Sequence, residues 1–196
     1  MTERAYHHGN LREALLTRAW ATIDDDGLDA LSMRQLARDV GVSHGASARH
    51  FADRTALLDA IAVTGFERMN ATLAEAVTSE PTFDARLRAA GLAYVRFAVE
   101  HPAILDLMYK AKHHPDASPE LLELSRASMA AVVALVAESQ AKGEIREGDV
   151  ERQALVVFAA VHGVAALATD DLLDGVAWQD AAESTIAVVL GAFAAD

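Results

Sequence analysis

Histidine pairs and one serine–histidine pair are the residues in this sequence whose types could support metal or nucleophilic chemistry. His7 with His8, and His113 with His114, could bind a metal, but adjacent side chains point in different directions and no cysteine or carboxylate set stands at ligand spacing. Ser43 and His44 are adjacent, so they do not form a nucleophile and a base that the fold brings together. The GxSxG, HExxH and glycine-rich phosphate-binding motifs do not occur. The sequence therefore predicts no catalytic residue, no metal and no cofactor, and we expect a protein that is not an enzyme.

The stretch from Leu31 to Arg54 has the pattern of two short helices joined by a tight turn. Gly41 ends the first helix, because glycine adopts the left-handed conformation at little cost. Val42 returns to the core, and Ser43 is a good N-cap for the second helix. The apolar residues of the first helix recur at helical spacing on one face: Met33, Leu36, Ala37 and Val40. This is the pattern of a helix-turn-helix unit, whose second helix enters the major groove of DNA, and it predicts a transcription regulator.

The flanking segments make the pattern more specific. A first helix, which Asn10 can cap, ends at the acidic segment Asp24–Gly27. The segment LSMRQLARDVGVS follows, then a short helix that ends in His50 and Phe51, and then a basic residue and the segment ALLDAI. This order resembles the N-terminal domain of TetR-family repressors over about residues 10 to 60. The segment YHHGNL at residues 6–11 is similar to one branch of that family, and residues 94–108 and 161–167 resemble that branch's C-terminal domain, which is named after a WHG motif.

The resemblance implies which residues contact DNA. Arg34, near the start of the second helix, is expected to contact a phosphate or a base, and Arg54 matches a phosphate contact at the start of the fourth helix. Arg34, Arg38 and Arg49 could otherwise be ordinary solvated residues, and His50 could cap the recognition helix instead of contacting a base. The expected DNA-binding set is Ser32, Arg34, Ser43, His44, Gly45, Ala46, Ala48, Arg49, His50 and Arg54.

The recognition helix departs from the family at two positions. Similar proteins usually have Leu-Tyr where this chain has Ser47 and Ala48. The leucine normally packs in the core of the domain, and the tyrosine normally reaches the DNA backbone. We therefore expect Ser47 to weaken the small core and Ala48 to remove one contact, which leaves a degenerate regulator with weak DNA binding as one alternative function. A non-enzymatic helical adaptor is the other.

The rest of the chain has the periodicity and punctuation of helices, with no sustained alternation typical of strands. Proline, glycine and capping residues place the helices at about residues 54–78, 83–100, 102–110, 119–142, 149–170 and 178–194. We expect an all-α protein of about nine helices. Residues 1–54 form a three-helix helix-turn-helix DNA-binding domain of TetR type, and residues 55–196 form an effector-binding and dimerisation domain.

The last two of these helices are apolar around most of their circumference, so they need burial on more than one side. In a chain of this size a second copy is the natural partner, and a four-helix interface between two copies would bury them. The apolar run from Ala154 to Thr169 includes His162 and Gly163, which favours a buried helix over a membrane span. We therefore expect a homodimer through the last two helices and no membrane partner.

Composition and charge agree with this interpretation. The 196 residues are 52% hydrophobic, which allows a substantial core, and the absence of cysteine excludes a disulfide scaffold and suits a reducing cytosol. No signal peptide pattern is present, so we expect a cytoplasmic protein. The net charge is −12, but residues 1–54 hold seven Arg and eight acidic residues, so the excess acid lies in the remainder. Phosphate binding depends on the local surface, and we expect modest non-specific DNA affinity with a shallow salt dependence.

The expected function is a ligand-responsive regulator, by family expectation a repressor, that binds a palindromic double-stranded DNA operator. A small, mostly apolar effector in the larger domain would tilt the helix at residues 54–78 and change the spacing of the two DNA-binding domains. The candidate pocket residues mix aromatic, thioether and polar groups, as a mostly apolar ligand requires: Tyr94, Phe97, Met108, Tyr109, Met129, Phe158 and His162. His162 is either a hydrogen-bonded core residue or a ligand contact, and each of the seven could instead serve packing alone.

Overall fold

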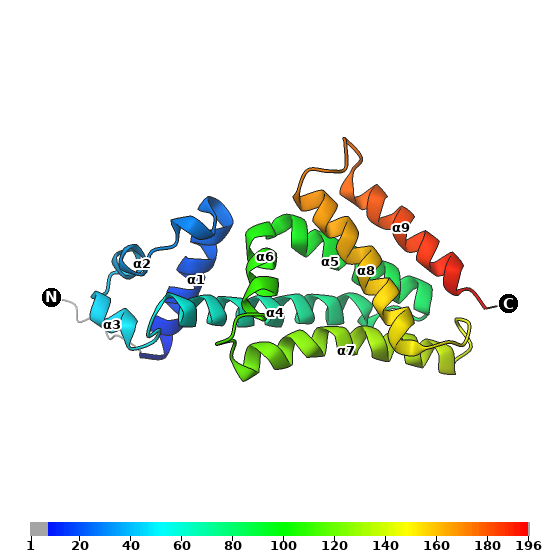
Figure 1. Cartoon of the computed structure of the whole chain (residues 1–196), viewed down its shortest axis with the longest axis horizontal. Coiled ribbons are helices and arrows are strands. Elements are labelled where there is room, and N and C mark those ends of the chain that lie inside the picture. The colour runs from blue at the N-terminus through cyan, green and yellow to red at the C-terminus, as the bar shows by residue number, and fades with distance from the viewer. Residues whose placement is uncertain (1–7, 196) are drawn as a thin grey trace. The chain divides into compact units, whose positions relative to one another are not determined.

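The computed structural model describes residues 8–195, so His7 of the first histidine pair and the segment before it lie outside the described residues. Within that range the chain forms nine α-helices and one 3-10 helix, which confirms the all-α prediction (Figure 1). The only β pairing among these residues is an isolated bridge between Ile145 and Ala194. The elements are α1 His8–Asp26, η1 Leu28–Ala30, α2 Met33–Asp39, α3 His44–Ala48, α4 Arg54–Thr78, α5 Phe83–Glu100, α6 Pro102–Ala111, α7 Pro119–Ala141, α8 Val150–Thr169 and α9 Trp178–Phe193.

The chain divides into two compact units. The first runs to Gly65 and also includes Ala103–Leu122, so it contains α1 to α3, the first half of α4, and α6. The second holds Phe66–Pro102 and the chain from Glu123 onward, including α5, α8 and α9. The division falls inside α4 and inside α7. The expected domain boundary between residues 54 and 55 stays a prediction.

The helix-turn-helix forms as the sequence predicts. Gly27 and Gly41 both have positive φ, +83° and +78°, and they end α1 and the turn after α2 at the positions where glycine was expected. The prediction that Asn10 caps the first helix is wrong, because α1 already begins at His8. Three helices contribute buried apolar side chains to the core of this part: Leu11, Leu15, Ala19, Trp20 and Ile23 from α1, Leu36 and Ala37 from α2, and Leu57, Ala60 and Ile61 from α4.

A close contact joins α4 and α6 in the first unit. A Cβ atom at Gly65 would lie 2.5 Å from Met108 Sδ and 2.8 Å from Met108 Cγ. Met108 is itself fully buried. The absence of a side chain at residue 65 is therefore what lets α6 lie this close to α4.

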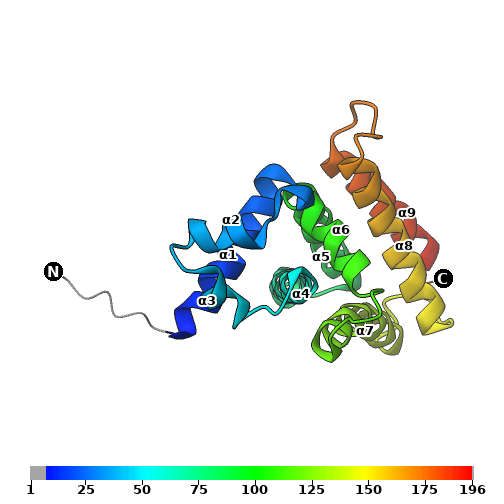
Figure 2. The ribbon, with the colours of Figure 1, turned by 60° about the vertical axis from the view of Figure 1, so that its left-hand side comes forward.

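The second unit is built around α5, α8 and α9, each of which packs on the other two. Figures 1 and 2 both show α8 and α9 side by side. A Cβ atom at Gly91 would lie 2.6 Å from Ile186 Cδ1, so glycine permits the approach of α9 to α5. Among the described helices, α8 is the one that is long and apolar enough to cross a membrane, on length and composition alone.

A buried arginine joins α5 to the end of α7. The Arg86 guanidinium donates hydrogen bonds to Glu138 Oε2 and Glu144 Oε2, both at 3.1 Å, and to Ser139 Oγ at 3.4 Å. Glu144 Oε2 also accepts from the Phe83 backbone N–H at 3.0 Å, near the start of α5. Because the charge has two carboxylate partners, its burial is compensated.

The helix ends agree closely with the sequence prediction. Thr82, Ser118 and Asp149 each accept a hydrogen bond from the backbone N–H three residues later. Each is thus an N-cap residue, of α5, α7 and α8 in turn.

Candidate DNA-binding surface and effector site

Serine caps begin both helices of the helix-turn-helix. Ser32 Oγ accepts a hydrogen bond from the Gln35 backbone N–H at 3.5 Å, and Ser43 Oγ accepts from the Ala46 N–H at 3.2 Å. Both serines are exposed. A hydroxyl that accepts in this way still has its own proton to donate, so both groups are able to bind a phosphate oxygen.

The exposed face of α3 carries small side chains. His44, Gly45 and Ala48 are exposed, Ala46 is half-buried, and a Cβ atom at Gly45 would meet only Ser43 Oγ, at 4.0 Å. Arg49 follows as an exposed C-cap residue. Small residues permit the helix backbone to approach a groove closely, while hydrogen-bond readout of bases is limited to the few longer side chains.

Ser47 lies on the opposite face of α3 and is completely buried. Its Oγ donates to the His44 backbone carbonyl at 2.8 Å, so the hydroxyl is not left without a partner in the core. This hydrogen bond is how the domain accepts a polar residue where similar proteins have leucine.

The arginines near α2 differ in how they are held. Arg34 is exposed on the first turn of α2. Arg38 donates to Gln35 Oε1, and Gln35 in turn donates to Asp39 Oδ1. Arg18 on α1 donates to Asp39 Oδ2 at 2.9 Å. Hydrogen bonds from Arg18 and then from Gln35 lower the pKa of Asp39, and this network ties α1 to α2 without engaging Arg34.

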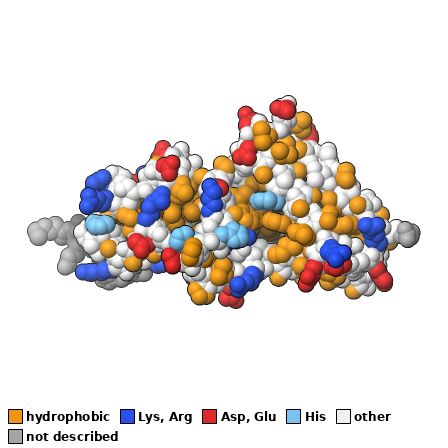
Figure 3. Space-filling view, viewed as in Figure 1, with side chains coloured by type: hydrophobic (Ala, Val, Ile, Leu, Met, Phe, Trp, Pro, Cys, Tyr) orange, Lys and Arg blue, Asp and Glu red, His pale blue; other side chains and the backbone are white. Residues whose placement is uncertain are grey.

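Arg54 makes a structural contact in addition to its expected role. Its Nη2 donates to the Leu28 carbonyl oxygen at 2.9 Å, which joins the start of α4 to η1. A guanidinium has five N–H donors, so this bond leaves others for a phosphate. On the face shown in Figure 3, Lys, Arg and His side chains are interspersed with acidic ones over the α1–α3 end of the chain.

Three of the residues expected to bind an effector come together in the second unit. Tyr94 Oη on α5 lies 2.8 Å from His162 Nδ1 on α8, within hydrogen-bond distance. The Phe158 ring stacks on the His162 ring with centroids 5.2 Å apart and planes 16° apart. Phe97, one turn beyond Tyr94, packs edge-on against His101, a residue that the sequence analysis did not select.

The remaining expected residues lie on α6 and α7. Met108 is buried beside Gly65 in the first unit, and Tyr109 lies next to it in sequence, with Lys112 Nζ 4.6 Å from its ring centroid. Burial lowers the pKa of Lys112. Met129 is half-buried on α7.

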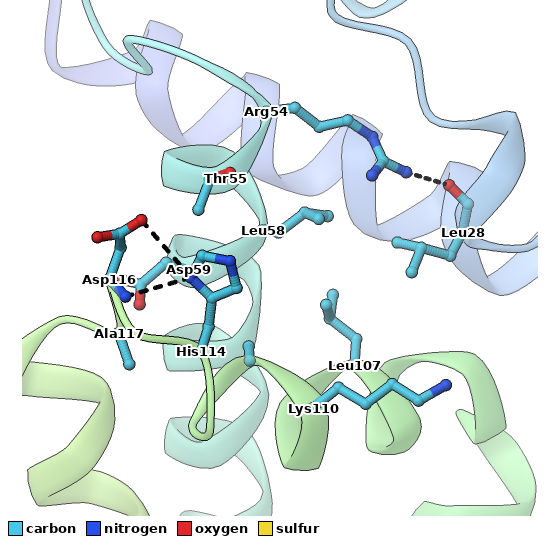
Figure 4. A pocket seen from close by; sticks show the side chains of 11 residues that line it. Leu28, Arg54, Thr55, Leu58, Asp59, Leu107, Lys110, His114, Asp116 and Ala117 are labelled. Carbon is cyan, nitrogen blue, oxygen red and sulfur yellow. Dashed lines mark hydrogen bonds and ion pairs between the residues drawn. The ribbon is translucent and has the colours of Figure 1, made fainter.

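The first unit contains a cavity of about 290 Å³ that the sequence analysis did not find (Figure 4). Its lining comes from η1, the start of α4, the end of α6 and the loop after α6. None of the seven expected effector residues is among the described residues that line it. Because the lining comes from three segments that are separate in the sequence, no local sequence pattern could have revealed it.

Two family descriptions match the chain. Residues 87–193 match the family described as the tetracyclin repressor-like C-terminal domain, and residues 15–61 match the family described as bacterial regulatory proteins of the tetR family. The chain belongs to the TetR family. The match at residues 15–61 contains the helix-turn-helix, and the match at residues 87–193 contains the Tyr94–His162–Phe158 cluster. The resemblance inferred from the sequence is therefore confirmed.

Solved structures share the fold of this chain. A protein of unknown function from Rhodococcus sp. RHA1 is 47% identical, with a TM-score of 0.91 over 98% of this chain and 100% of that one. A TetR family transcription regulator from Marinobacter aquaeolei VT8 is 17% identical, with a TM-score of 0.72 over 94% and 96% of the two chains. The TetR family transcriptional regulator PfmR from Thermus thermophilus is 18% identical, with a TM-score of 0.70 over 90% and 97%; these last two show a shared fold. No curated protein matches the chain.

Proposed function

We propose that this TetR-family regulator is a cytoplasmic, non-enzymatic repressor that binds a palindromic operator as a homodimer and is released by a small, mostly apolar molecule. The observation that carries the proposal is the pair of serine-capped helices of the helix-turn-helix, with Arg34 exposed on α2, His44 exposed on α3 and Arg49 exposed at the end of α3. Arginine and histidine can contact phosphates and base edges, and the exposed serine hydroxyls can donate to phosphate oxygens.

The exposed faces of α8 and α9 support the homodimer. Leu155 and Val156 on α8 are 57% and 48% exposed, and Val188 on α9 is 73% exposed. Gly163 and Gly191 lie on the same two helices, and a Cβ atom at either would have no neighbour within 4 Å. Large apolar side chains beside such glycines form a surface that a second copy could approach closely.

The Tyr94–His162–Phe158 cluster supports an effector site in the second unit. It joins two aromatic rings and a hydrogen-bonding imidazole, the mixture that binds a mostly apolar molecule with one polar group. In our proposal the effector shifts α4, which runs from one compact unit into the other, and so alters the spacing of two recognition helices that must fit half-sites one turn apart, roughly 34 Å. A roughly 100-fold preference of the effector for the DNA-free state would supply about 2.7 kcal/mol of coupling.

Substitution of Arg34 tests the DNA-binding surface. Arg34→Ala should weaken operator binding at least about tenfold in a fluorescence-anisotropy titration, because each dimer loses two contacts to phosphate or base. Arg126→Ala removes another exposed arginine, on α7, and should leave operator affinity unchanged. The operator itself comes from footprinting on DNA upstream of the protein's own gene.

Two results would count against this proposal. Equal operator affinity for the wild type and Arg34→Ala would remove Arg34 from the contact surface. A footprint with no protected palindrome at low salt would reject the operator-binding function as a whole.

A further inference from the structure

The cavity in the first unit has an apolar wall between two cationic side chains. Leu28, Leu58 and Leu107 supply the wall from η1, α4 and α6. Arg54 and Lys110 also line the cavity. Figure 4 shows that these two side chains extend in the same direction, on either side of the three leucines. An amphipathic anion is the ligand that could satisfy both parts of this lining at once.

One acidic residue of the lining, Asp59, has a hydrogen-bond partner, and the other, Asp116, is exposed to solvent. Asp59 Oδ1 accepts from the Ser118 backbone N–H at 2.9 Å. The Asp116 backbone N–H donates to His114 Nδ1 at 3.2 Å, and Asp116 Oδ2 lies 3.8 Å from the same nitrogen. In Figure 4 these residues lie on the side away from the ends of Arg54 and Lys110. Their negative charge is therefore directed away from the place where an anion would bind.

The two cations keep donors for a ligand. Arg54 uses one N–H on the Leu28 carbonyl oxygen, and Lys110 Nζ uses one on Asp106 Oδ2 at 2.8 Å. A guanidinium has five donors and an ammonium has three, so each can also bind a carboxylate oxygen. The contact of Met108 with the backbone at Gly65 fixes α6 against α4, which gives the cavity a defined wall on both sides.

We propose that this cavity binds a small organic carboxylate, with its apolar body on the three leucines and its carboxylate at Lys110. A volume of about 290 Å³ lies at the small end of the range for ligand pockets, roughly 300–1,000 Å³. Arg54, at the other end of the leucine wall, is an expected phosphate contact, so a ligand body that lies on this wall competes with DNA for the space beside Arg54. This effect on DNA rests on the proposed function, whereas binding of the carboxylate does not.

Isothermal titration of the full-length protein without DNA tests the site directly. Hexanoate is the probe, and hexanamide and inorganic phosphate are its neutral and non-apolar counterparts. Hexanoate should bind saturably, and Lys110→Gln should weaken it roughly tenfold through loss of one charge-assisted hydrogen bond. Lys142→Gln is the matched control, because Lys142 is another exposed lysine paired with a carboxylate four residues earlier; it should bind hexanoate like the wild type.

Three results would overturn the proposal: no saturable hexanoate binding up to about 10 mM, equal binding by hexanamide or phosphate, or an unchanged affinity in Lys110→Gln. Anisotropy with operator DNA then tests competition. Hexanoate should release DNA from the wild type at lower concentration than from Lys110→Gln, and binding without any effect on DNA would reject the competition. A protein that binds no operator even without hexanoate would reject the proposed function, while the calorimetric result would still decide the site.

Discussion

Ser47 shows how a single polar side chain can occupy the core of a small DNA-binding domain. The residue is fully buried, and its hydroxyl donates to a carbonyl one turn earlier in its own helix. The sequence alone predicts a weaker core at this position, because leucine is usual there in similar proteins. The structure shows that the hydroxyl has a partner and that the side chain is completely buried. Because protein cores are closely packed, we expect a larger side chain to be crowded at this position.

Restoring leucine at residue 47 should therefore destabilise this domain. Ser47→Leu should lower the free energy of unfolding by about 1–3 kcal/mol, the usual cost of adding volume to a packed core. Urea unfolding in a Trp178→Phe background measures this, because Trp20, buried in α1, is then the only tryptophan in the chain. Ser47→Ala, which removes the hydroxyl and adds no volume, is the control and should have a smaller effect. A more stable Ser47→Leu protein would show that the core has room for leucine.

Residues also show what sequence could not predict. Helix ends were predictable because capping serines, prolines and glycines act on their immediate neighbours, as at Ser43 and Gly41. The pairing of Tyr94 with His162 spans 68 residues, and both were selected only as separate candidates. The bond from Arg54 to the Leu28 carbonyl was not expected at all, because backbone acceptors leave no trace in side-chain patterns.

At the scale of elements, α8 and α9 each have one face that residues 8–195 do not cover. On α8 the exposed residues include Leu155, Ala159 and Leu167, which recur at helical spacing. On α9 they include Ala187 and Val188. The opposite faces pack within the second unit, where Val161 and Ile186 are buried. The sequence predicts that each of these helices is buried on more than one side. In the structure, one side of each helix is buried within the second unit, and another side is exposed.

A charge placed on the uncovered face should separate the proposed dimer. Val188→Glu should raise the dimer dissociation constant at least about 100-fold, because association would bury a carboxylate without a partner. Val188 is 73% exposed, so the substitution should leave the fold of the chain intact. Ala134→Glu, on an exposed position of α7, is the control and should remain dimeric. Sedimentation equilibrium measures both, and a Val188→Glu protein as dimeric as the wild type would place the interface elsewhere.

At the scale of the whole molecule, charge limits how strongly the protein can bind DNA without regard to sequence. The chain carries a net charge of −12, and the segment with the helix-turn-helix has slightly more acidic residues than arginines. Two of the nearby arginines, Arg18 and Arg38, already donate to side chains of the domain. The cations that remain for phosphates are therefore few, principally Arg34, Arg49 and Arg54.

The salt dependence of operator binding should reflect this small number. Each neutralised phosphate contributes about 0.9 to the slope of log K against log salt, so roughly six contacts in a dimer give a slope of about −5. Arg34→Ala should reduce the magnitude of that slope by about 2, one contact for each copy. Anisotropy titrations over a series of KCl concentrations measure both slopes. A wild-type slope near −10 would require about twice as many phosphate contacts as this surface offers.

The buried Arg86 also restricts when the second unit can close during synthesis. Its carboxylate partners Glu138 and Glu144 follow it by 52 and 58 residues, so they leave the ribosome well after α5 has done so. Until the two glutamates emerge, the free energy of the guanidinium is lower in water than in a core without a counterion. We therefore expect α5 to stay incompletely packed until translation has passed the end of α7. The helix-turn-helix, whose contacts are local, can fold while the rest of the chain is still being made.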